Sequence, residues 1–342
     1  MFLNGTWRCI EIDDFFPVGK NGKPLCAYSS KGQLWIPILE KAYLKSQGGY
    51  NFPGSNSDID IYTFTSWMPE RLDFKKDDTN KIWKRLLSGM SYHNCMATIS
   101  TGDLKNEDAL GLCGGHAYGV LRSVECDGER MLMIKNPWGK YVWKGKYSKP
   151  NSLWTPNLRK ACNYEETSKL EGIFWIDYQS VIENFEAITY NWNPELLRFK
   201  KQCIGLWEAK EFPEDDESDA TNTPQYLVRF NQESSQSNDI ICWVIFSVLE
   251  KQTDVDDGFH AIHVFLQNNC NQMPMLSKPF IKGVYSNRKC TLTYISLSMN
   301  ELLATGNIIK LMVSETMKKS DLPYMLVFNQ NRILFHTWLR YD

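Results

Sequence analysis

The sequence lacks a charge excess of either sign and lacks a long apolar run. Lys plus Arg total 38 and Asp plus Glu total 40, a net charge of -2 at pH 7, so charge does not favour a nucleic acid or an anionic membrane as partner. The longest apolar run, 240–249, is far shorter than the roughly 18 residues of a membrane-spanning helix. The first residues, MFLNGTWRC, show no basic or apolar signal region, so we expect neither a transmembrane segment nor secretion.

Metal-binding cysteine spacing is also absent. The ten cysteines lie at irregular intervals, with no C-x-x-C pair and no Cys/His cluster of zinc-finger spacing. In a chain without a secretory signal, such cysteines are typical of reduced thiols, so we predict a cytoplasmic, intracellular protein without a metal site. Cys242 lies in an apolar run and is predicted to be a small core residue.

A composition shift near Asn193-Pro194 predicts two domains, at 1–195 and 196–342. In the first part, helical signals are mixed with strand signals and glycine. One helix is predicted at 33–45 and a second, shorter one at 80–89. The apolar positions of the first helix share one face, made of Trp35, Ile38, Leu39, Ala42 and Tyr43.

A β-hairpin is the clearest local signal in this part. One β-rich segment begins at His116 and a second at Arg130, and Asp127-Gly128 lies between them. Asp-Gly is typical of the tight turn that joins two antiparallel strands. The hairpin therefore brings its open ends, at His116 and Asn136, close together.

The second part of the chain is predicted to be all-β. Short β-rich runs alternate with polar or Gly/Pro/Asn-rich stretches at the spacing of a β-sandwich. These runs are 225–230, 241–249, 260–267, 290–297, 307–314, 323–328 and 333–340. The acidic stretch 211–220 before them is interpreted as a solvated loop, with a calcium or partner site as the alternative. The predicted fold class is α+β with mostly antiparallel strands.

His116 and Asn136 have the chemistry of an acid–base pair. An imidazole can take the proton of a thiol and return it to a leaving amine, while an amide oxygen accepts the other ring N–H and fixes the tautomer. Gly114 and Gly115 leave room beside the imidazole, and Trp138 is predicted to cover the His–Asn contact. A lone His–Asn pair is more often structural than catalytic, so the surrounding residues decide.

Several longer strings surround this pair. GHAYGV, IKNPWG and WKGKYS enclose the two residues, LWIPILEKAYLKSQGGY precedes them, and GIFWIDYQSVIENF (172–185) follows. Together they closely resemble the calpain family of papain-like cysteine endopeptidases. GSNSDIDIYTFTSWMPER (54–71) and WTPNL (154–158) resemble its PalB-like, or calpain seven type, branch.

The resemblance covers residues 3 to 195. It implies limited proteolysis of protein substrates, with His116 and Asn136 as catalytic residues and Trp138, Gly114 and Gly115 beside them. Residues 1–195 are then the His/Asn lobe of the protease core. Residues 196–342 resemble, more loosely, the C2-like β-sandwich that follows this core in PalB-like calpains.

The resemblance also indicates what this sequence does not hold. In the family, the nucleophilic cysteine and the oxyanion-hole glutamine precede the segment that Gly5-Thr6-Trp7 resembles. That cysteine lies at a helix N-terminus, where the helix field lowers the thiol pKa. We therefore expect this chain to lack the nucleophile lobe and to be inactive alone. Cys113 or Cys95 as a substitute nucleophile is the alternative, although neither begins a long amphipathic helix.

No calcium site is expected in the first half of the chain, and no other cofactor is indicated. Conventional calpains offer carboxylates in the loop after the asparagine block, because calcium prefers several hard oxygen ligands. Val142 and Lys149 stand at the corresponding positions and offer none. Glu171 can offer one carboxylate, and Ile173 cannot.

Two functional hypotheses remain open. The first is a calpain-type cysteine endopeptidase whose nucleophile lobe is missing from this sequence. The second is a catalytically inactive interaction protein, a pseudoprotease, that binds partners through its sandwich. In both cases the expected partners are proteins, among them the missing lobe itself.

Overall fold

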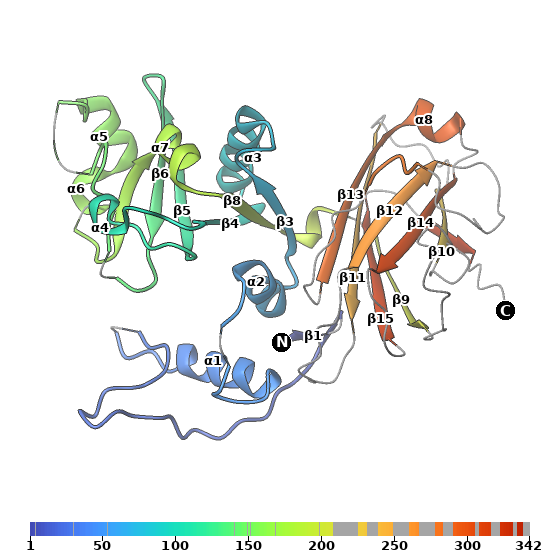
Figure 1. Ribbon diagram of the computed structural model, residues 1–342, viewed down its shortest axis with the longest axis horizontal. Coiled ribbons are helices and arrows are strands. Elements are labelled where there is room, and N and C mark those ends of the chain that lie inside the picture. The colour runs from blue at the N-terminus through green and yellow to red at the C-terminus, as the bar shows by residue number, and fades with distance from the viewer. Residues whose placement is uncertain are drawn as a thin grey trace. The chain divides into compact units, whose positions relative to one another are not determined.

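The computed structural model describes most of residues 1–207 and the strands beyond them. Within 1–207 the positions outside the description are 4, 30, 53, 140, 149, 151, 168 and 198. Beyond residue 207 the described ranges are 225–230, 239–248, 260–266, 278–282, 290–304, 308–315, 322–330 and 334–337, so the acidic stretch 211–220 lies outside them. Contacts divide the chain into two compact units, one of Ser55–Pro194 and one that joins Met1–Gly54 to Glu195–Asp342 (Figure 1). The predicted boundary at 195/196 stays a prediction.

The unit Ser55–Pro194 is built on one six-stranded antiparallel sheet with the order β3-β8-β4-β5-β6-β7. Its strands are β3 (Met68–Asp73), β4 (Cys95–Ser100), β5 (Ala117–Cys126), β6 (Glu129–Lys135), β7 (Ile173–Asp177) and β8 (Ala187–Trp192). Its helices are α2 (Ser57–Thr65), α3 (Thr79–Ser91), α4 (Glu107–Leu110), α5 (Pro156–Cys162), α6 (Tyr164–Thr167) and α7 (Tyr178–Asn184), followed by a 3-10 turn, η1 (Pro194–Leu196). The helix predicted at 80–89 is confirmed as α3.

The predicted hairpin is confirmed as β5 and β6. Cys126 pairs with Glu129, so the loop between the strands has two residues. Asp127 and Gly128 both have positive φ, 52° and 80°, which is the type I′ geometry that matches the twist of the two strands. A bulge between Val120 and Arg122 shifts the register farther along the pair.

Both faces of this sheet are covered, which explains why β6 is apolar at four successive positions, 131–134. Leu132 and Ile134 belong to a core cluster with residues of α3 and α7. Met131 and Met133 belong to a second cluster with residues of α5 and α6. Because successive side chains of a strand point to opposite faces, a strand buried on both sides needs apolar residues at every position.

An ion pair ties α3 to the edge of the sheet. Arg85 of α3 donates through Nη1 and Nη2 to the two carboxylate oxygens of Glu70 on β3, at 2.9 and 2.5 Å. Trp192 of β8 donates its indole N–H to the same carboxylate at 2.7 Å, and the guanidinium lies 5.1 Å from the Trp192 ring. The Glu70 side chain is only 10% exposed, so this carboxylate has exchanged water for three protein donors.

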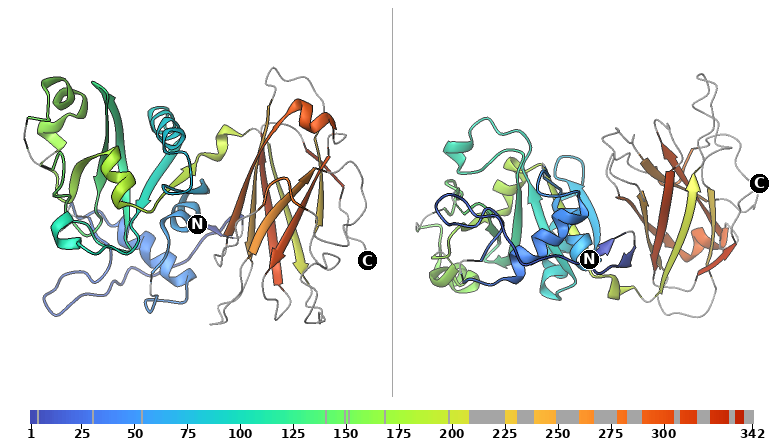
Figure 2. Two further views of the ribbon diagram at one scale, coloured as in Figure 1. Left: turned by 45° about the horizontal axis from the view of Figure 1, so that its top comes forward. Right: turned by 90° about the horizontal axis from the view of Figure 1, so that it is seen from below.

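The second unit contains two four-stranded antiparallel sheets, drawn as two layers in Figures 1 and 2. Their orders are β13-β11-β15-β9 and β12-β14-β10-β16. One hydrophobic cluster combines residues of both sheets, so the sheets pack face to face, and Cys242 lies fully buried in it as predicted. The bounds are β9 (Phe199–Trp207), β10 (Gln225–Phe230), β11 (Asp239–Val248), β12 (His260–Leu266), β13 (Cys290–Ser298), α8 (Met299–Ala304), β14 (Ile308–Glu315), β15 (Leu322–Gln330) and β16 (Leu334–Thr337).

All seven predicted runs of this half contain a strand, whereas β9 and α8 were not predicted. The prediction of a mixed chain with mostly antiparallel strands is thereby confirmed. Within the described part of the chain, no helix has the length and apolar character needed to cross a membrane.

The segment Met1–Gly54 contains β1 (Phe2–Leu3), β2 (Thr6–Trp7) and α1 (Trp35–Ser46), which confirms the helix predicted at 33–45. Its predicted apolar face is only partly buried. Ala42 and Tyr43 are buried, while Trp35 is 59% and Ile38 is 42% exposed. The period of a sequence places side chains on one face, but it does not show how much of that face is covered.

Candidate active site

His116 and Asn136 meet at the open end of the hairpin. His116 directly precedes β5 and Asn136 directly follows β6. The His116 Nε2 and Asn136 Oδ1 atoms are 3.2 Å apart, which is hydrogen-bond distance. The predicted proximity of the two side chains is therefore confirmed, and Asn136 is fully buried.

Trp138 lies against the imidazole. Its ring centroid is 4.3 Å from that of His116, with a tilt of 41° between the planes. The indole remains 62% exposed, so one side of the ring faces His116 while much of it is open to solvent. The predicted position of Trp138 beside the His–Asn contact is confirmed.

Three further hydrogen bonds fix the orientation of Asn136. Its backbone N–H donates to Gly172 O at 2.8 Å, and its side-chain Nδ2 donates to Tyr141 O at 2.9 Å. Oδ1 also accepts from the Trp138 N–H at 3.0 Å. Because Nδ2 is bonded to a carbonyl, Oδ1 must face the imidazole. His116 then donates its Nε2–H, and Nδ1 carries the free lone pair.

Burial lowers the pKa of His116 below the ordinary value of 6.5, and the hydrogen bond with Asn136 acts in the opposite direction. Burial disfavours the imidazolium, whereas an acceptor on Nε2–H favours it. The net effect keeps His116 neutral, and therefore able to accept a proton, at neutral pH.

The two glycines before His116 differ in their surroundings. Gly115 has a φ of +57° and open space where a Cβ would lie, as expected for a residue that leaves room beside the imidazole. Gly114 does not leave room, because a Cβ there would lie 2.6 Å from Glu107 Oε1. The expectation of open space is wrong for Gly114, which instead permits a close approach of the backbone to Glu107.

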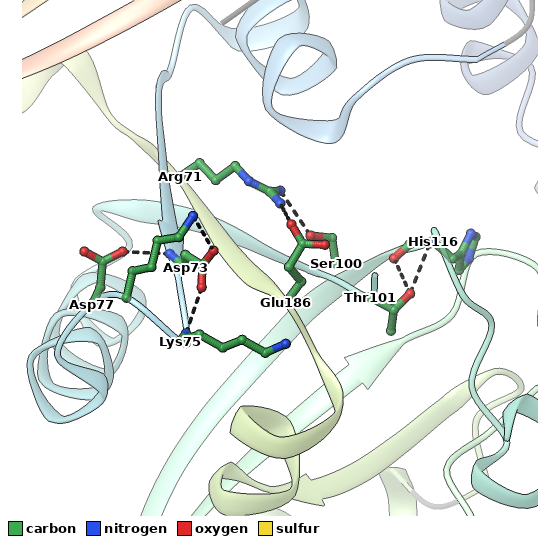
Figure 3. A network of polar contacts seen from close by, with 9 residues as sticks. Arg71, Asp73, Lys75, Asp77, Ser100, Thr101, His116 and Glu186 are labelled. Carbon is green, nitrogen blue, oxygen red and sulfur yellow. Dashed lines mark hydrogen bonds and ion pairs between the residues drawn. The ribbon is translucent and has the colours of Figure 1, made fainter. Parts of the chain in front are cut away.

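The sequence did not indicate Thr101, which also contacts this site. Its hydroxyl accepts from the His116 N–H at 3.1 Å and donates to Cys113 O at 2.6 Å. Figure 3 shows the contacts of Thr101 with His116 just after β4, beside the exposed pair of Arg71 and Glu186. A hydrogen bond between a side chain and the backbone of a residue 15 positions away produces no recognisable spacing pattern in a sequence.

Three of the four residues considered for calcium, Val142, Glu171 and Ile173, lie in the described part of the chain. Val142 is partly exposed and Lys149 lies outside the described residues. Glu171 is exposed, and it is its backbone carbonyl that Lys135 Nζ contacts, at 2.6 Å. Among the described residues no group of three or more His, Cys, Asp or Glu side chains could hold a metal ion.

Burial raises the thiol pKa of six of the described cysteines, and in four of them the shift is large. Burial raises the pKa of Cys95, Cys162 and Cys242 to about 12 and that of Cys203 to about 11. A nucleophilic cysteine needs the opposite shift, because the thiolate is the reactive form. Cys95, one of the two alternative nucleophiles, is therefore unsuited to that role.

An imidazole whose second nitrogen is fixed by an amide oxygen is the acid–base arrangement of thiol proteases. Residues 1–191 match the calpain family of cysteine proteases. The chain is 36% identical over 320 residues to calpain-7 of Sus scrofa, covering 87% of this chain and 38% of that protein. It is 30% identical over 282 residues to the calpain-like protease palB/RIM13 of Aspergillus oryzae (77% and 32%), and 33% identical over 215 residues to palB of Emericella nidulans (60% and 24%).

The chain belongs to the calpain family of cysteine proteases, and its relatives include calpain-7 and the PalB-like enzymes. It spans 38% or less of the length of each of these three relatives.

Proposed function

We propose that this chain provides the acid–base half of a calpain-type cysteine endopeptidase that cleaves protein substrates. The observation that carries the proposal is the 3.2 Å contact of His116 Nε2 with Asn136 Oδ1 beneath the Trp138 ring. The family membership supports the same reaction class.

In the proposed reaction His116 acts as a base and then as an acid. Nδ1 takes the proton of a cysteine thiol as the sulfur attacks the scissile carbonyl carbon. The imidazolium then gives that proton to the leaving amine, and an acyl-enzyme remains. Water hydrolyses the acyl-enzyme, with Nδ1 accepting a proton from water and returning it to the sulfur. Asn136 keeps the ring oriented throughout these steps.

We assign the nucleophile to a part of the enzyme beyond the described residues. Buried thiols such as Cys95 and Cys162 support this assignment, because burial raises the pKa of each by more than the nearby Arg85 or Arg122 lowers it, and the reactive form of a cysteine is the thiolate. A nucleophile lobe would then be the first protein partner of this chain. Cys113 remains the alternative that labelling can test.

For the second half of the chain we propose a C2-like β-sandwich domain at 196–342, following a protease core at 1–195. Two face-to-face antiparallel sheets with a shared core support this assignment. The proposed role of this domain is to bind partner proteins. For the location we propose an intracellular, reducing compartment, supported by the irregular spacing of the ten cysteines.

Supplying the nucleophile tests the proposal. The purified 342-residue chain is incubated with an unfolded protein substrate and, in a separate reaction, with a thiol-directed epoxide. Each reaction is run with and without the nucleophile lobe of a calpain-7 relative. We expect no cleavage by the chain alone and cleavage once the lobe is present. The variant His116→Ala should lose activity on the order of a million-fold, to background.

His93→Asn is the matched control, because His93 is exposed in a turn with a φ of 55°, a conformation that asparagine tolerates. Its activity should equal that of the unmodified chain. Stoichiometric labelling of Cys113 in the isolated chain, abolished by His116→Ala, would show that the nucleophile lies within this sequence. If the chain cleaves nothing even with a nucleophile lobe supplied, the second hypothesis, a catalytically inactive interaction protein, is favoured.

A further inference from the structure

A short loop, residues 112–116, delivers His116 to the site, and each of its backbone N–H groups is bonded. The N–H of Leu112 donates to Glu107 O, that of Cys113 to the Tyr118 hydroxyl, that of Gly114 to Glu107 Oε1, that of Gly115 to Gly102 O and that of His116 to Thr101 Oγ1, at 2.7 to 3.2 Å. We call this segment the histidine loop. A segment with all its donors bonded has few alternative conformations.

Thr101 contacts the histidine loop at the catalytic residue itself. Its side chain is buried, with 4% exposure. Its hydroxyl accepts from His116 N and lies within donating distance of Cys113 O and, at 3.2 Å, of His116 O; the Thr101 backbone N–H also donates to His116 O at 3.0 Å. The peptide groups on both sides of the His116 Cα are thus fixed by Thr101, the residue that directly follows β4.

Glu107 contacts the opposite end of the loop. Its carboxylate accepts from Gly114 N at 2.8 Å, and its backbone carbonyl accepts from Gly111 and Leu112. The absence of a Cβ at Gly114 allows this approach. Thr101 and Glu107 therefore hold the histidine loop at its two ends.

We propose that Thr101 is a positioning residue for His116, with Glu107 as a second support of the same loop. This inference rests on the proposed function, because it concerns the imidazole that would accept the thiol proton. Neither side chain bonds the ring. They fix the backbone from which the ring extends, and so fix where Nδ1 lies relative to an incoming thiol.

Two variants of Thr101 separate the hydroxyl from the shape of the side chain. Thr101→Val keeps the shape and removes all the hydroxyl bonds, whereas Thr101→Ser keeps the hydroxyl. The measurement is NMR of the full chain labelled with ¹⁵N at its five histidines, with the His116 signal assigned from its loss in His116→Ala. We expect the Nε2–H tautomer in the unmodified chain and in Thr101→Ser. In Thr101→Val we expect a mixture of tautomers and faster exchange of the Nε2 proton.

Thr293→Val is the matched control. Thr293 is also a buried threonine whose hydroxyl donates to a carbonyl, Ile262 O at 3.1 Å, but it belongs to the other unit. Its replacement should leave the His116 signal unchanged. Near-UV circular dichroism, to which the fully buried Trp83 and Tyr118 of the same unit as Thr101 contribute, reports in every variant whether that unit is folded. A Thr101→Val chain that is folded and keeps the His116 tautomer and exchange rate overturns the proposal.

Glu107 keeps the test decisive if Thr101→Val does not fold. Glu107 is exposed, so its replacement does not disturb a core. Glu107→Ala should alter the His116 signal in the same direction as Thr101→Val, and Glu107→Gln, which keeps an acceptor oxygen, should not. An unchanged signal in Glu107→Ala would overturn the role of this residue.

Activity gives a second and separate readout once a nucleophile lobe is supplied. Thr101→Val should lower kcat by about 100-fold, the order expected when a reacting group is misplaced by about 1 Å, while KM stays unchanged and Thr101→Ser restores kcat. An unmodified enzyme that remains inactive contradicts the proposed function and leaves the NMR result on positioning intact. An equal loss of kcat in both Thr101 variants would contradict positioning by the hydroxyl.

Discussion

At the scale of single residues, the side-chain amide of Asn136 determines which nitrogen of His116 is available for chemistry. Nδ2 is bonded to the Tyr141 carbonyl, so Oδ1 accepts the Nε2–H of His116. The lone pair on Nδ1 is then the site that accepts a proton. The same hydrogen bond raises the pKa that burial lowers, so Asn136 controls both the tautomer and the basicity of the imidazole.

Two replacements of Asn136 should shift the pKa of His116 in opposite directions. Asn136→Ala removes the acceptor that favours the imidazolium, so the pKa should fall below that of the unmodified chain. Asn136→Asp places a carboxylate next to the ring, which should raise the pKa by ~1 unit or more. An NMR titration of the labelled histidines measures both shifts. Shifts of the same sign in the two variants would show that Asn136 does not act through this hydrogen bond.

The residues of the site differed in how far the sequence could identify them. His116, Asn136 and Trp138 could be predicted to lie together, because a two-residue hairpin loop fixes which residues of its strands are neighbours. Thr101 and Glu107 could not, because their contacts join a side chain to a backbone in another segment. The error at Gly114 has the same origin, since the close approach of Glu107 is a feature of the folded chain.

At the scale of secondary structure elements, local signals were sufficient for α1, α3 and the β5–β6 hairpin but not for the order of the sheet. β8 lies between β3 and β4, so residues 187–192 pair with residues 68–73 and 95–100. The amphipathic periods of strands show which face is buried, but they do not show which strands are neighbours when more than 80 residues separate them.

The ion pair between α3 and β3 predicts a large loss of stability when it is broken. Glu70→Gln removes the charge that binds Arg85 and leaves one acceptor oxygen for the three donors that the carboxylate binds. Because Glu70 is almost fully buried, the free energy of unfolding should fall by about 3 kcal/mol. Urea denaturation followed by circular dichroism measures this change.

The pair of Arg71 and Glu186 is the matched control for this measurement. It joins the same two residue types at 2.8 Å, but its side chains are 35% and 46% exposed. Glu186→Gln should lower the free energy of unfolding by less than about 1 kcal/mol, as for most surface ion pairs. Equal losses in the two variants would mean that burial is not what makes the Glu70 pair strong.

At the scale of the whole molecule, two histidines make stability depend on pH. Burial lowers the pKa of His116 and of His263, one in each unit, below the ordinary value of 6.5. As pH falls below about 6.5, the unfolded chain binds protons at these positions before the folded chain does. Stability should therefore be highest above pH 6.5 and fall as the pH drops through the lowered folded pKa values.

Thermal unfolding at pH 7.5, 6.5 and 5.5 measures this loss in a range above the titration of the carboxylates. His263→Gln should reduce the pH dependence of the unit Met1–Gly54 plus Glu195–Asp342, and His116→Gln that of the unit Ser55–Pro194. A midpoint that rises on acidification from pH 7.5 to 5.5 would contradict the lowered pKa values.

The contact of Trp138 with His116 has an optical consequence. The chain contains twelve tryptophans, and this indole lies with its ring centroid 4.3 Å from an imidazole that titrates. An imidazolium attracts an indole face through its charge and also accepts an electron from the excited indole, which quenches its fluorescence. The emission of Trp138, isolated as the difference between the unmodified chain and Trp138→Phe, should therefore dim when His116 gains a proton. The protein thus carries an intrinsic fluorescent reporter of the proton on which the proposed chemistry depends.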